Sequence, residues 1–331
     1  MNSRGRFPQR GAALLLAMVI VALITTVASG MVWLQTRAVQ VEAAERARAQ
    51  SAWILSGALD WARLILKEDG RDASRRGQAR DSLDEPWATP LAEARLSTFL
   101  AADKDNNTDT GPEAFISGAI VDAQSRFNLR GLVDPSGKQQ PLQVAALQRL
   151  ADLAGAPGDT AARIAGGLSA SLGGGGEEGA AGTTGVTGAS SRPLRPGQLA
   201  DLTWLGIDPA TLARLAPWVE LLPLATPVNA NTAPREVLLA AIDGIDLGTA
   251  ERLVSSRQRK PFESLADIQA LLPEGAKAEG SRVGVGSSWF LVSGRLRLEE
   301  RVLEERSLLQ REGERVSVRR RERHSFTAAA Q

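Results

Sequence analysis

The amino-terminal part of the chain passes from a short charged stretch into a long apolar one. Within residues 12–34, the residues that are not plainly apolar are Thr25, Thr26, Ser29 and Gly30. A helix rises ~1.5 Å per residue, so this run is long enough to cross a hydrocarbon core of ~30 Å. The pattern predicts a membrane-spanning helix.

Beyond residue 34 the apolar positions become periodic and indicate an amphipathic helix. No proline interrupts the sequence between Pro8 and Pro86. The positions that share one helix face are Ile54, Ala58, Trp61 and Ile65. We therefore predict one helix that runs from about residue 12 to about residue 68 and includes the membrane span.

Three interpretations of the amino-terminal segment are open. It is a cleaved secretory signal peptide with a small-residue cleavage site at residues 27–29, an uncut signal anchor, or a leader removed on the cytoplasmic side at Gly11. The long helix favours the third, because a signal peptide has no reason to continue into it. The junction resembles that of type IV pilins and pseudopilins, in which prepilin peptidase cuts after the glycine.

The charges around the apolar run predict its orientation. Arg4, Arg6 and Arg10 precede it without an acidic residue, whereas the segment beyond it mixes both signs. Positively charged flanks stay in the cytoplasm. We expect a single-pass protein of the inner membrane of a Gram-negative envelope, with its amino end in the cytoplasm and the bulk of the chain in the periplasm.

The composition argues against an enzyme. The chain has no cysteine and a single histidine, His324, near its carboxyl end. Thiolate metal sites and the usual Ser–His or zinc-hydrolase constellations are therefore excluded, and a carboxylate-only site is the class left open. The net charge of +1 gives no overall field that favours nucleic acid. We expect no catalysis, no nucleic-acid partner and no required cofactor.

One polar stretch is a candidate calcium loop. Its alternating oxygen-bearing residues are Asp103, Asp105, Asn107 and Asp109. They are placed like the first ligand positions of an EF-hand. However, Thr108 and Ala114 stand where an EF-hand needs glycine and glutamate. We favour an acidic, solvated loop and keep calcium as the alternative.

Period-two patterns predict strands in two regions. Residues 115–129 predict a hairpin with a strand at 115–121, a turn at 122–125 and a second strand that contains Phe127 and Leu129. Near the carboxyl end, the runs 289–298, 301–310 and 314–321 predict an antiparallel meander that packs on the long helix.

Between these regions the pattern is helical. Residues 141–155 and 159–172 predict two helices, and the glycine-rich residues 173–192 predict a flexible loop. Further on, Thr232 is a candidate cap for a third helix. A tight turn at 243–246 then leads to helices at 249–256 and 265–272.

The turn at 243–246 and its flanking helices resemble a helix-hairpin-helix repeat, which offers backbone N–H groups to a DNA phosphate. A membrane-anchored DNA-binding protein of competence type is therefore the rival function. Asp243 and Asp246 in the turn oppose it, because carboxylates repel phosphate. We interpret the nearby basic residues as solvated charges at helix ends. These residues are Arg252, Arg257, Arg259 and Lys260.

The order of several motifs along the chain resembles the K-type minor pseudopilins of type II secretion. The motifs are RGAALLLAMVIVALI, DSLDEPWA, VDAQSRFNL, VNANTAPREVLLAAI and the terminal strand segment. The resemblance implies an α+β fold in which a pilin-like long amino-terminal helix packs on an antiparallel sheet, with a large all-helical insertion of helix-hairpin-helix or SAM-like type. It implies a leader at 1–11, a transmembrane part at 12–34, head segments at 35–132 and 285–331, and the insertion at 133–284.

The resemblance also implies a role and partners. Prepilin peptidase would cut between Gly11 and Ala12 and Ala12 would be N-methylated. The subunit would cap or start the pseudopilus tip with I-type and J-type minor pseudopilins, for export of folded proteins, with cargo and the outer-membrane secretin as further contacts. The fifth mature residue is Leu16, where most pilins carry glutamate. A tip subunit lacks an axial neighbour for that acid, and a buried acid without a partner is costly.

Overall fold

The computed structural model describes residues 10–77, 80–96, 114–172, 194–298 and 301–327. These residues fall into two compact units, Met1–Gly57 and Ala58–Gln331. Helix α1 (Arg10–Arg76) belongs to both of them.

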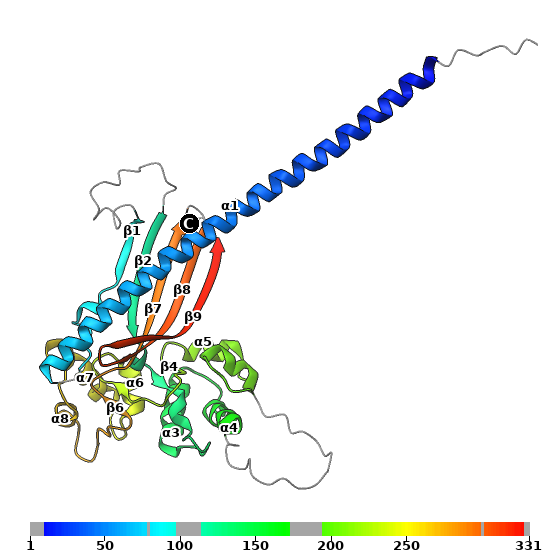
Figure 1. Ribbon diagram of the computed structural model, residues 1–331. Coiled ribbons are helices and arrows are strands. Elements are labelled where there is room, and N and C mark those ends of the chain that lie inside the picture. Colours follow the sequence, from blue (N-terminus) through cyan, green and yellow to red (C-terminus); the bar gives the residue numbers. More distant parts are fainter. Residues whose placement is uncertain (1–9, 78–79, 97–113, 173–193, 299–300, 328–331) are drawn as a thin grey trace, which may run out of the picture. The chain divides into compact units, whose positions relative to one another are not determined.

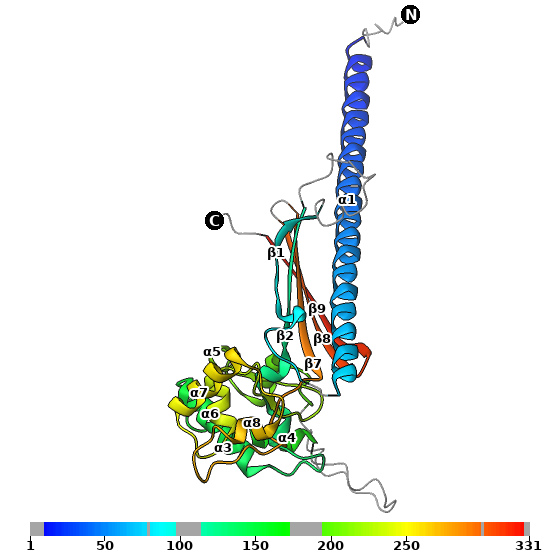
Figure 2. The ribbon, with the colours of Figure 1, turned by 90° about the vertical axis from the view of Figure 1, so that its left-hand side faces the viewer.

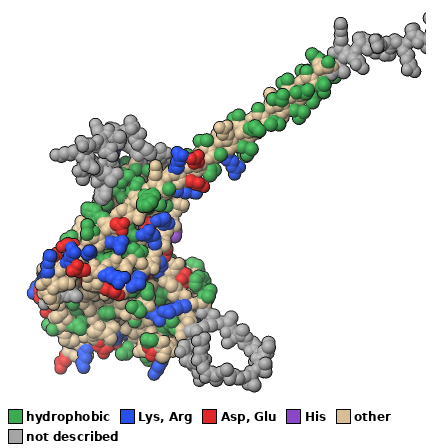
Figure 3. All heavy atoms as spheres, viewed as in Figure 1, with side chains coloured by type: hydrophobic (Ala, Val, Ile, Leu, Met, Phe, Trp, Pro, Cys, Tyr) green, Lys and Arg blue, Asp and Glu red, His purple; other side chains and the backbone are tan. Residues whose placement is uncertain are grey.

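The first unit consists of the amino-terminal part of α1, which is helical from its first described residue. Its most apolar stretch has a mean hydropathy of 2.4, and by length and composition it can cross a membrane. Hydrophobic side chains line the visible face of this part of the helix (Figure 3). The hydroxyl groups of Thr25 and Thr26 donate to the carbonyl oxygens of Val21 and Ala22 at 2.9 and 3.0 Å. These polar groups are therefore satisfied inside the helix, as a lipid environment requires.

Helix α1 ends at Arg76, eight residues beyond the end predicted at residue 68. Gly77 follows with φ of +71°, a conformation that suits a glycine after a helix. Gly70 lies inside the helix, where it has a packing role. A Cβ atom at Gly70 would lie 2.4 Å from the carbonyl oxygen of Gly313, so the missing side chain lets the helix approach the sheet.

The second unit is built on a five-stranded antiparallel sheet with the order β1-β2-β7-β8-β9 (Figure 1). The strands are β1 (Leu91–Arg95), β2 (Ala114–Asp122), β7 (Trp289–Leu298), β8 (Arg301–Glu312) and β9 (Arg315–Thr327). The predicted carboxyl-terminal meander is thus confirmed. Alternating burial on β7 is the physical basis of its period-two pattern.

The carboxyl-terminal part of α1, residues 58–76, lies along one face of this sheet (Figure 2). The side chains that join the two layers form one buried cluster, with Trp87 at its edge in contact with Phe290 at 5.3 Å between ring centroids. The members of this cluster are Leu59, Ala62, Leu66, Trp87, Phe290, Val292, Leu309 and Val316. The long-helix-on-sheet prediction is confirmed.

The strand predicted at 115–121 is confirmed as β2, but the predicted hairpin is wrong because β2 and the segment at Phe127 do not pair with each other. Strand β2 pairs with β1 and β7, while β3 (Phe127–Asn128) pairs in parallel with β4 (Val219–Glu220). The turn after Asp122 is a short 3-10 helix, Ala123–Ser125, that leads the chain away from the sheet. The side chain of Asn128 then donates to the carbonyl oxygen of Leu224 at 2.7 Å, which ties this segment to the helical region.

The chain between β2 and β7 forms a mostly helical body with its own hydrophobic core (Figure 1). Its helices are α3 (Pro141–Leu153), α4 (Thr160–Leu172), α5 (Pro209–Leu215), α6 (Arg235–Ala241), α7 (Leu247–Arg259) and α8 (Leu265–Gln269). Strands β5 (Val228–Asn229) and β6 (Val283–Gly284) pair in parallel inside it. The core begins with Phe127, before the predicted boundary at 133. The glycine-rich loop at 173–192 lies outside the described residues.

Candidate functional site

Most of the predicted site residues fall at or beyond the limits of the described chain. Arg4 and Arg6 lie outside the described residues, as do the candidate calcium ligands at positions 103, 105, 107 and 109. Arg10 is the first residue of α1, and Gly11 and Ala12 follow it in the helix. Leu16 is 63% exposed on the helix. The cleavage, methylation and calcium sites therefore stay predictions.

The described chain instead brings three of the sequence motifs together at the point where it leaves and re-enters the sheet. We call the buried polar side chains at this point the neck cluster. The cluster consists of Asp69, Asp81, Glu85, Asp122, Asn229, Thr232, Ser287 and Arg311. It joins the end of α1, the segment DSLDEPWA, the end of β2, the segment VNANT and strand β8.

Asp122 is the centre of the neck cluster on the side of the helical body. Its carboxylate accepts hydrogen bonds from the backbone N–H of Gln124 at 2.7 Å and from the hydroxyl groups of Thr232 and Ser287, both at 2.6 Å. The Nδ2 group of Asn229 donates to it at 2.9 Å. These donors come from segments that lie more than a hundred residues from Asp122 in the sequence, so one carboxylate holds distant parts of the chain together.

The environment of Asp122 disfavours its charge. Burial raises the pKa of this carboxyl group to about 6, against the opposing effect of the hydroxyl donors on Ser287 and Thr232. The nearby charge of Asp81 raises it further. Hydrogen bonds therefore stabilise the Asp122 carboxylate, although burial makes its ionised form unfavourable.

Asn229 links Asp122 to the other half of the cluster. Its side chain is fully buried, and its Nδ2 group lies 3.0 Å from both the carbonyl oxygen of Asp81 and the hydroxyl group of Ser287. Its Oδ1 atom accepts from the backbone N–H of Asn231 at 3.0 Å. Asp81 in turn accepts from the backbone N–H of Ser287 at 2.7 Å. All members of the neck cluster except Glu85 are thus joined in one network of hydrogen bonds and ion pairs.

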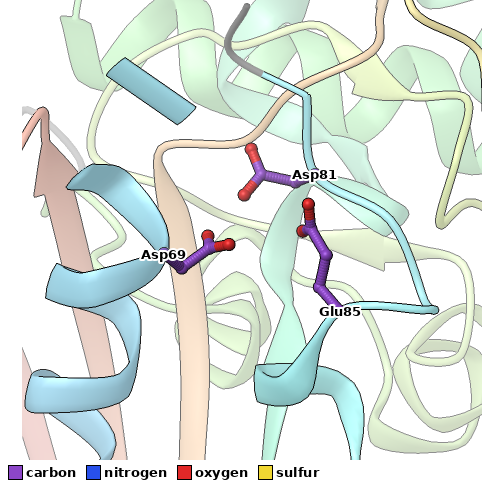
Figure 4. A group of neighbouring side chains, drawn as sticks. All are labelled: Asp69, Asp81 and Glu85. Carbon is purple, nitrogen blue, oxygen red and sulfur yellow. The ribbon is translucent and has the colours of Figure 1, made fainter. Parts of the chain in front are cut away.

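On the side of α1, three carboxylates of the cluster face one another (Figure 4). Asp69 belongs to α1, whereas Asp81 and Glu85 follow the helix, and one oxygen of each lies within 4.8 Å of the others. The guanidinium group of Arg311 forms ion pairs with Asp69 and Asp81. Burial raises the pKa of Asp69 and of Glu85, and the neighbouring carboxylates add to this effect. Arg311 lowers the pKa of Asp69.

We tested whether this acidic group fits a calcium ion. Calcium is bound in proteins by carboxylate and carbonyl oxygens, and the three carboxylates are suitable ligands. However, the Arg311 guanidinium already contacts Asp69 and Asp81, and the Asp81 and Asp69 charges raise the pKa of Arg311 in spite of its burial. The residues present fit an arginine-neutralised cluster and not a resident metal ion.

The acidic residues of the helix-hairpin-helix turn make contacts within the chain. Asp246 caps α7, accepting from the backbone N–H of Thr249 at 2.8 Å, and this contact lowers the pKa of Asp246. Asp243 forms ion pairs with Arg149, at 2.5 Å, and with Arg282. Protein carboxylates thus occupy the place where a DNA phosphate would bind.

Two sequence interpretations near this turn are wrong. Arg257 is not a solvated charge, because its side chain is buried and donates to the carbonyl oxygen of Ala230 at 2.6 Å. Burial lowers the pKa of Arg257 to about 10. Thr232 does not cap α6, whose amino-terminal boundary residue is Pro234. Its hydroxyl group is turned toward Asp122 instead, which offers a charged acceptor.

Sequence reasoning assigned no role to Asp69, Glu85 or Arg311. Asp69 and Arg311 lie in charged stretches that look solvated in one dimension. The available signal was the acidic pair next to Trp87 in DSLDEPWA, because the N–H group of a buried tryptophan usually finds a hydrogen-bond acceptor. Indeed, Trp87 donates its Nε1–H to Glu85 at 2.8 Å.

Comparisons with known proteins agree with this architecture. Two family models described as type II secretion system protein K match residues 125–224 and 228–286. A type II secretion system protein K of Pseudomonas aeruginosa is 30% identical over 305 residues, which cover 88% of this chain and 86% of the relative. The protein K of Pectobacterium carotovorum subsp. carotovorum is 28% identical over 337 residues, covering 96% and 97%.

The fold also matches a solved structure. The crystal structure of the GspK-GspI-GspJ complex from the enterotoxigenic Escherichia coli type 2 secretion system contains a chain that superposes with a TM-score of 0.59. The sequence identity is 21%, and the match covers 85% of this chain and 98% of that chain. The α+β fold is therefore confirmed.

Proposed function

The chain belongs to the type II secretion system protein K family and is a minor pseudopilin, and we propose that it caps or starts the periplasmic pseudopilus at its tip. In this role it would assemble with the I-type and J-type minor pseudopilins for the export of folded proteins across the outer membrane. The similar chain of known structure comes from a complex of GspK, GspI and GspJ, which supports this choice of partners. Cargo and the outer-membrane secretin are further proposed contacts.

The observation that supports a position at the pseudopilus tip is the size of the helical body between β2 and β7. It has a hydrophobic core of its own that is larger than the cluster between α1 and the sheet. A body of this size obstructs a neighbour stacked against it, so it suits a subunit that has no neighbour on one side. Leu16 agrees with this position, because an apolar residue there needs no charged partner in the next subunit.

The amino-terminal part of α1 supports an anchor in the inner membrane. We propose that its amino end is cytoplasmic and that the head is periplasmic, in line with the leader charges of Arg4, Arg6 and Arg10. Trp33 lies at the end of the apolar run, with the Arg37 guanidinium 5.6 Å from its ring centroid. A tryptophan is typical of a membrane–water interface, which would place the outer boundary of the membrane here.

We propose that the protein acts by assembly and not by catalysis. The neck cluster is made of buried structural contacts, and His324 lies on β9, exposed, 3.9 Å from Glu322. Prepilin peptidase would cut after Gly11 and Ala12 would be N-methylated. Calcium at Asp103, Asp105, Asn107 and Asp109 is a separate proposal, which a calcium titration of the chain with D103N and D105N tests.

Co-purification from membranes tests the proposed assembly. The tagged full-length chain is expressed with its I-type and J-type pseudopilins and extracted in mild detergent. We expect all three to elute together in equal amounts, and we expect the chain lacking the helical body to be unable to restore secretion to a strain without the native subunit. An I–J pair that forms while the chain elutes alone would contradict the proposal.

A further inference from the structure

Arg311 is buried, and its guanidinium group contacts two carboxylates, a carbonyl oxygen and an aromatic ring. It forms ion pairs with Asp69 and Asp81, and its Nη2 group donates to the carbonyl oxygen of Ser287 at 3.1 Å. Its Cζ atom lies 4.8 Å from the ring centroid of Phe290. A planar group with a fixed fork of donors suits two carboxylates from different segments. Arg311 thus joins α1 to the segment that follows it.

The third carboxylate, Glu85, lies beside this pair without a hydrogen bond to Arg311. Its Oε2 atom accepts from the backbone N–H of Ser82 at 3.1 Å and from Trp87 at 2.8 Å. Its Oε1 atom is buried and has no hydrogen-bond partner among the described residues. The nearest cation to it is the Nη2 group of Arg76 at 3.7 Å. The local charge is therefore negative even with Arg311 in place.

We infer that Arg311 occupies the position of a divalent cation. The cation that neutralises the carboxylates of the neck cluster is then a side chain of the protein itself. Three carboxylates within 4.8 Å of one another offer the oxygen ligands that calcium prefers. A buried ionised carboxylate without a counter-charge is strongly destabilising, so a cation among the three stabilises their ionised form. The guanidinium group meets this need for Asp69 and Asp81 without any metal ion.

This inference predicts a gain of metal dependence when the guanidinium group is removed. In Arg311→Ala the carboxylates and the vacated volume remain, and calcium has room to bind them. We expect the unfolding midpoint of the full-length variant in detergent to rise by about 5 °C at a hundredfold excess of calcium over its Kd. The wild-type chain should show no shift that depends on this cluster.

Terbium luminescence provides a local readout of the same site. Terbium replaces calcium at oxygen sites and emits when a nearby indole is excited, and Trp87 is bonded to Glu85. We expect excitation at the tryptophan band to give more terbium emission in Arg311→Ala than in wild type. The emission should be lost in Arg311→Ala with Glu85→Gln, whereas a signal from residues 103–109 would be unchanged by E85Q.

Two further variants keep the test decisive. Arg257→Gln is the matched control, because Arg257 is equally buried but donates to a backbone carbonyl oxygen, so its loss should lower the midpoint without a calcium response. Arg311→Gln removes the positive charge and offers an amide oxygen as a ligand, so it should also become calcium-responsive. If neither Arg311 variant is stabilised by calcium, or if the response survives E85Q, the inference is wrong.

Discussion

Removal of the Thr232 hydroxyl group tests whether the neck cluster holds the helical body on the sheet. Thr232→Val keeps the branched shape and removes the donor that lies 2.6 Å from Asp122. A hydrogen bond to a charged acceptor contributes about 1.5–3 kcal/mol. Asp122 keeps its contacts with Asn229 and Ser287, so we expect a loss of about 2 kcal/mol in the free energy of unfolding at pH 8.

The pH dependence of this loss identifies its cause. The pKa of Asp122 is about 6, so its carboxyl group is mostly protonated in the folded chain at pH 5. The bond from Thr232 then reaches a neutral acceptor, and its removal should cost about 1 kcal/mol. The difference of about 1 kcal/mol between the two pH values corresponds to a further rise of roughly 0.7 in the pKa of Asp122 in the variant.

The measurement is urea unfolding of the full-length chain in detergent, followed by tryptophan fluorescence at pH 5 and pH 8. Thr203→Val is the matched control, because the exposed Thr203 hydroxyl donates to Ala200, three residues back in the chain. We expect a change of no more than about 0.5 kcal/mol for this control. A T232V variant that behaves like T203V, or whose loss is the same at both pH values, would refute the role of Asp122 as the anchor.

The remaining predictions concern packing and charge, and unfolding of the full-length chain measures each. Gly70→Ala places a Cβ atom 2.4 Å from the Gly313 carbonyl oxygen and should destabilise the folded chain by about 1–3 kcal/mol. Gly57→Ala is the control, because a Cβ atom there meets nothing within 4 Å among the described residues, and it should stabilise the folded chain by about 0.5–1 kcal/mol. Equal effects would contradict the close approach. Leu66→Ala empties a fully buried position and should cost about 2–5 kcal/mol. The pKa of Asp122 is raised from 3.8 to about 6 in the folded state. The stabilising effect of its neutral carboxyl group on the folded state is therefore fully present below pH 3.8 and is lost as the pH rises through about 6. Stability of wild type relative to Asp122→Asn should therefore fall by roughly 3 kcal/mol over this window, and a flat difference would refute the buried charge.

Patterns set by nearby residues were the predictable part of this fold. Strand β7 has the bounds that its period-two run predicted, 289–298, because Phe290, Val292 and Leu296 are buried on one face and the residues between them are less buried. The meander follows from short turns such as the one at Gly313, whose φ is +61°. Helix α1 was predicted because its apolar spacing persists without a proline.

Features that depend on distant partners were not predictable from these patterns. The hairpin at 115–129 failed because the side chain of Asn128 bonds to Leu224, and nothing in the local spacing indicates that contact. Arg257 and Arg311 are surrounded in sequence by charged residues that are exposed, so each looks solvated until the fold buries it. Thr232 has the residue type of a helix cap, but a buried carboxylate from another segment is the stronger acceptor.

The amino terminus of the mature protein is the most direct test of the proposed pseudopilin role. Mass spectrometry of the chain from membranes of its native host should detect a peptide that begins at Ala12 and carries one methyl group on its amino nitrogen. Gly11→Val should leave the leader uncut, because the peptidase needs the residue without a side chain at this junction. An intact leader in the wild-type chain, or a mature start near Gly30, would contradict the account.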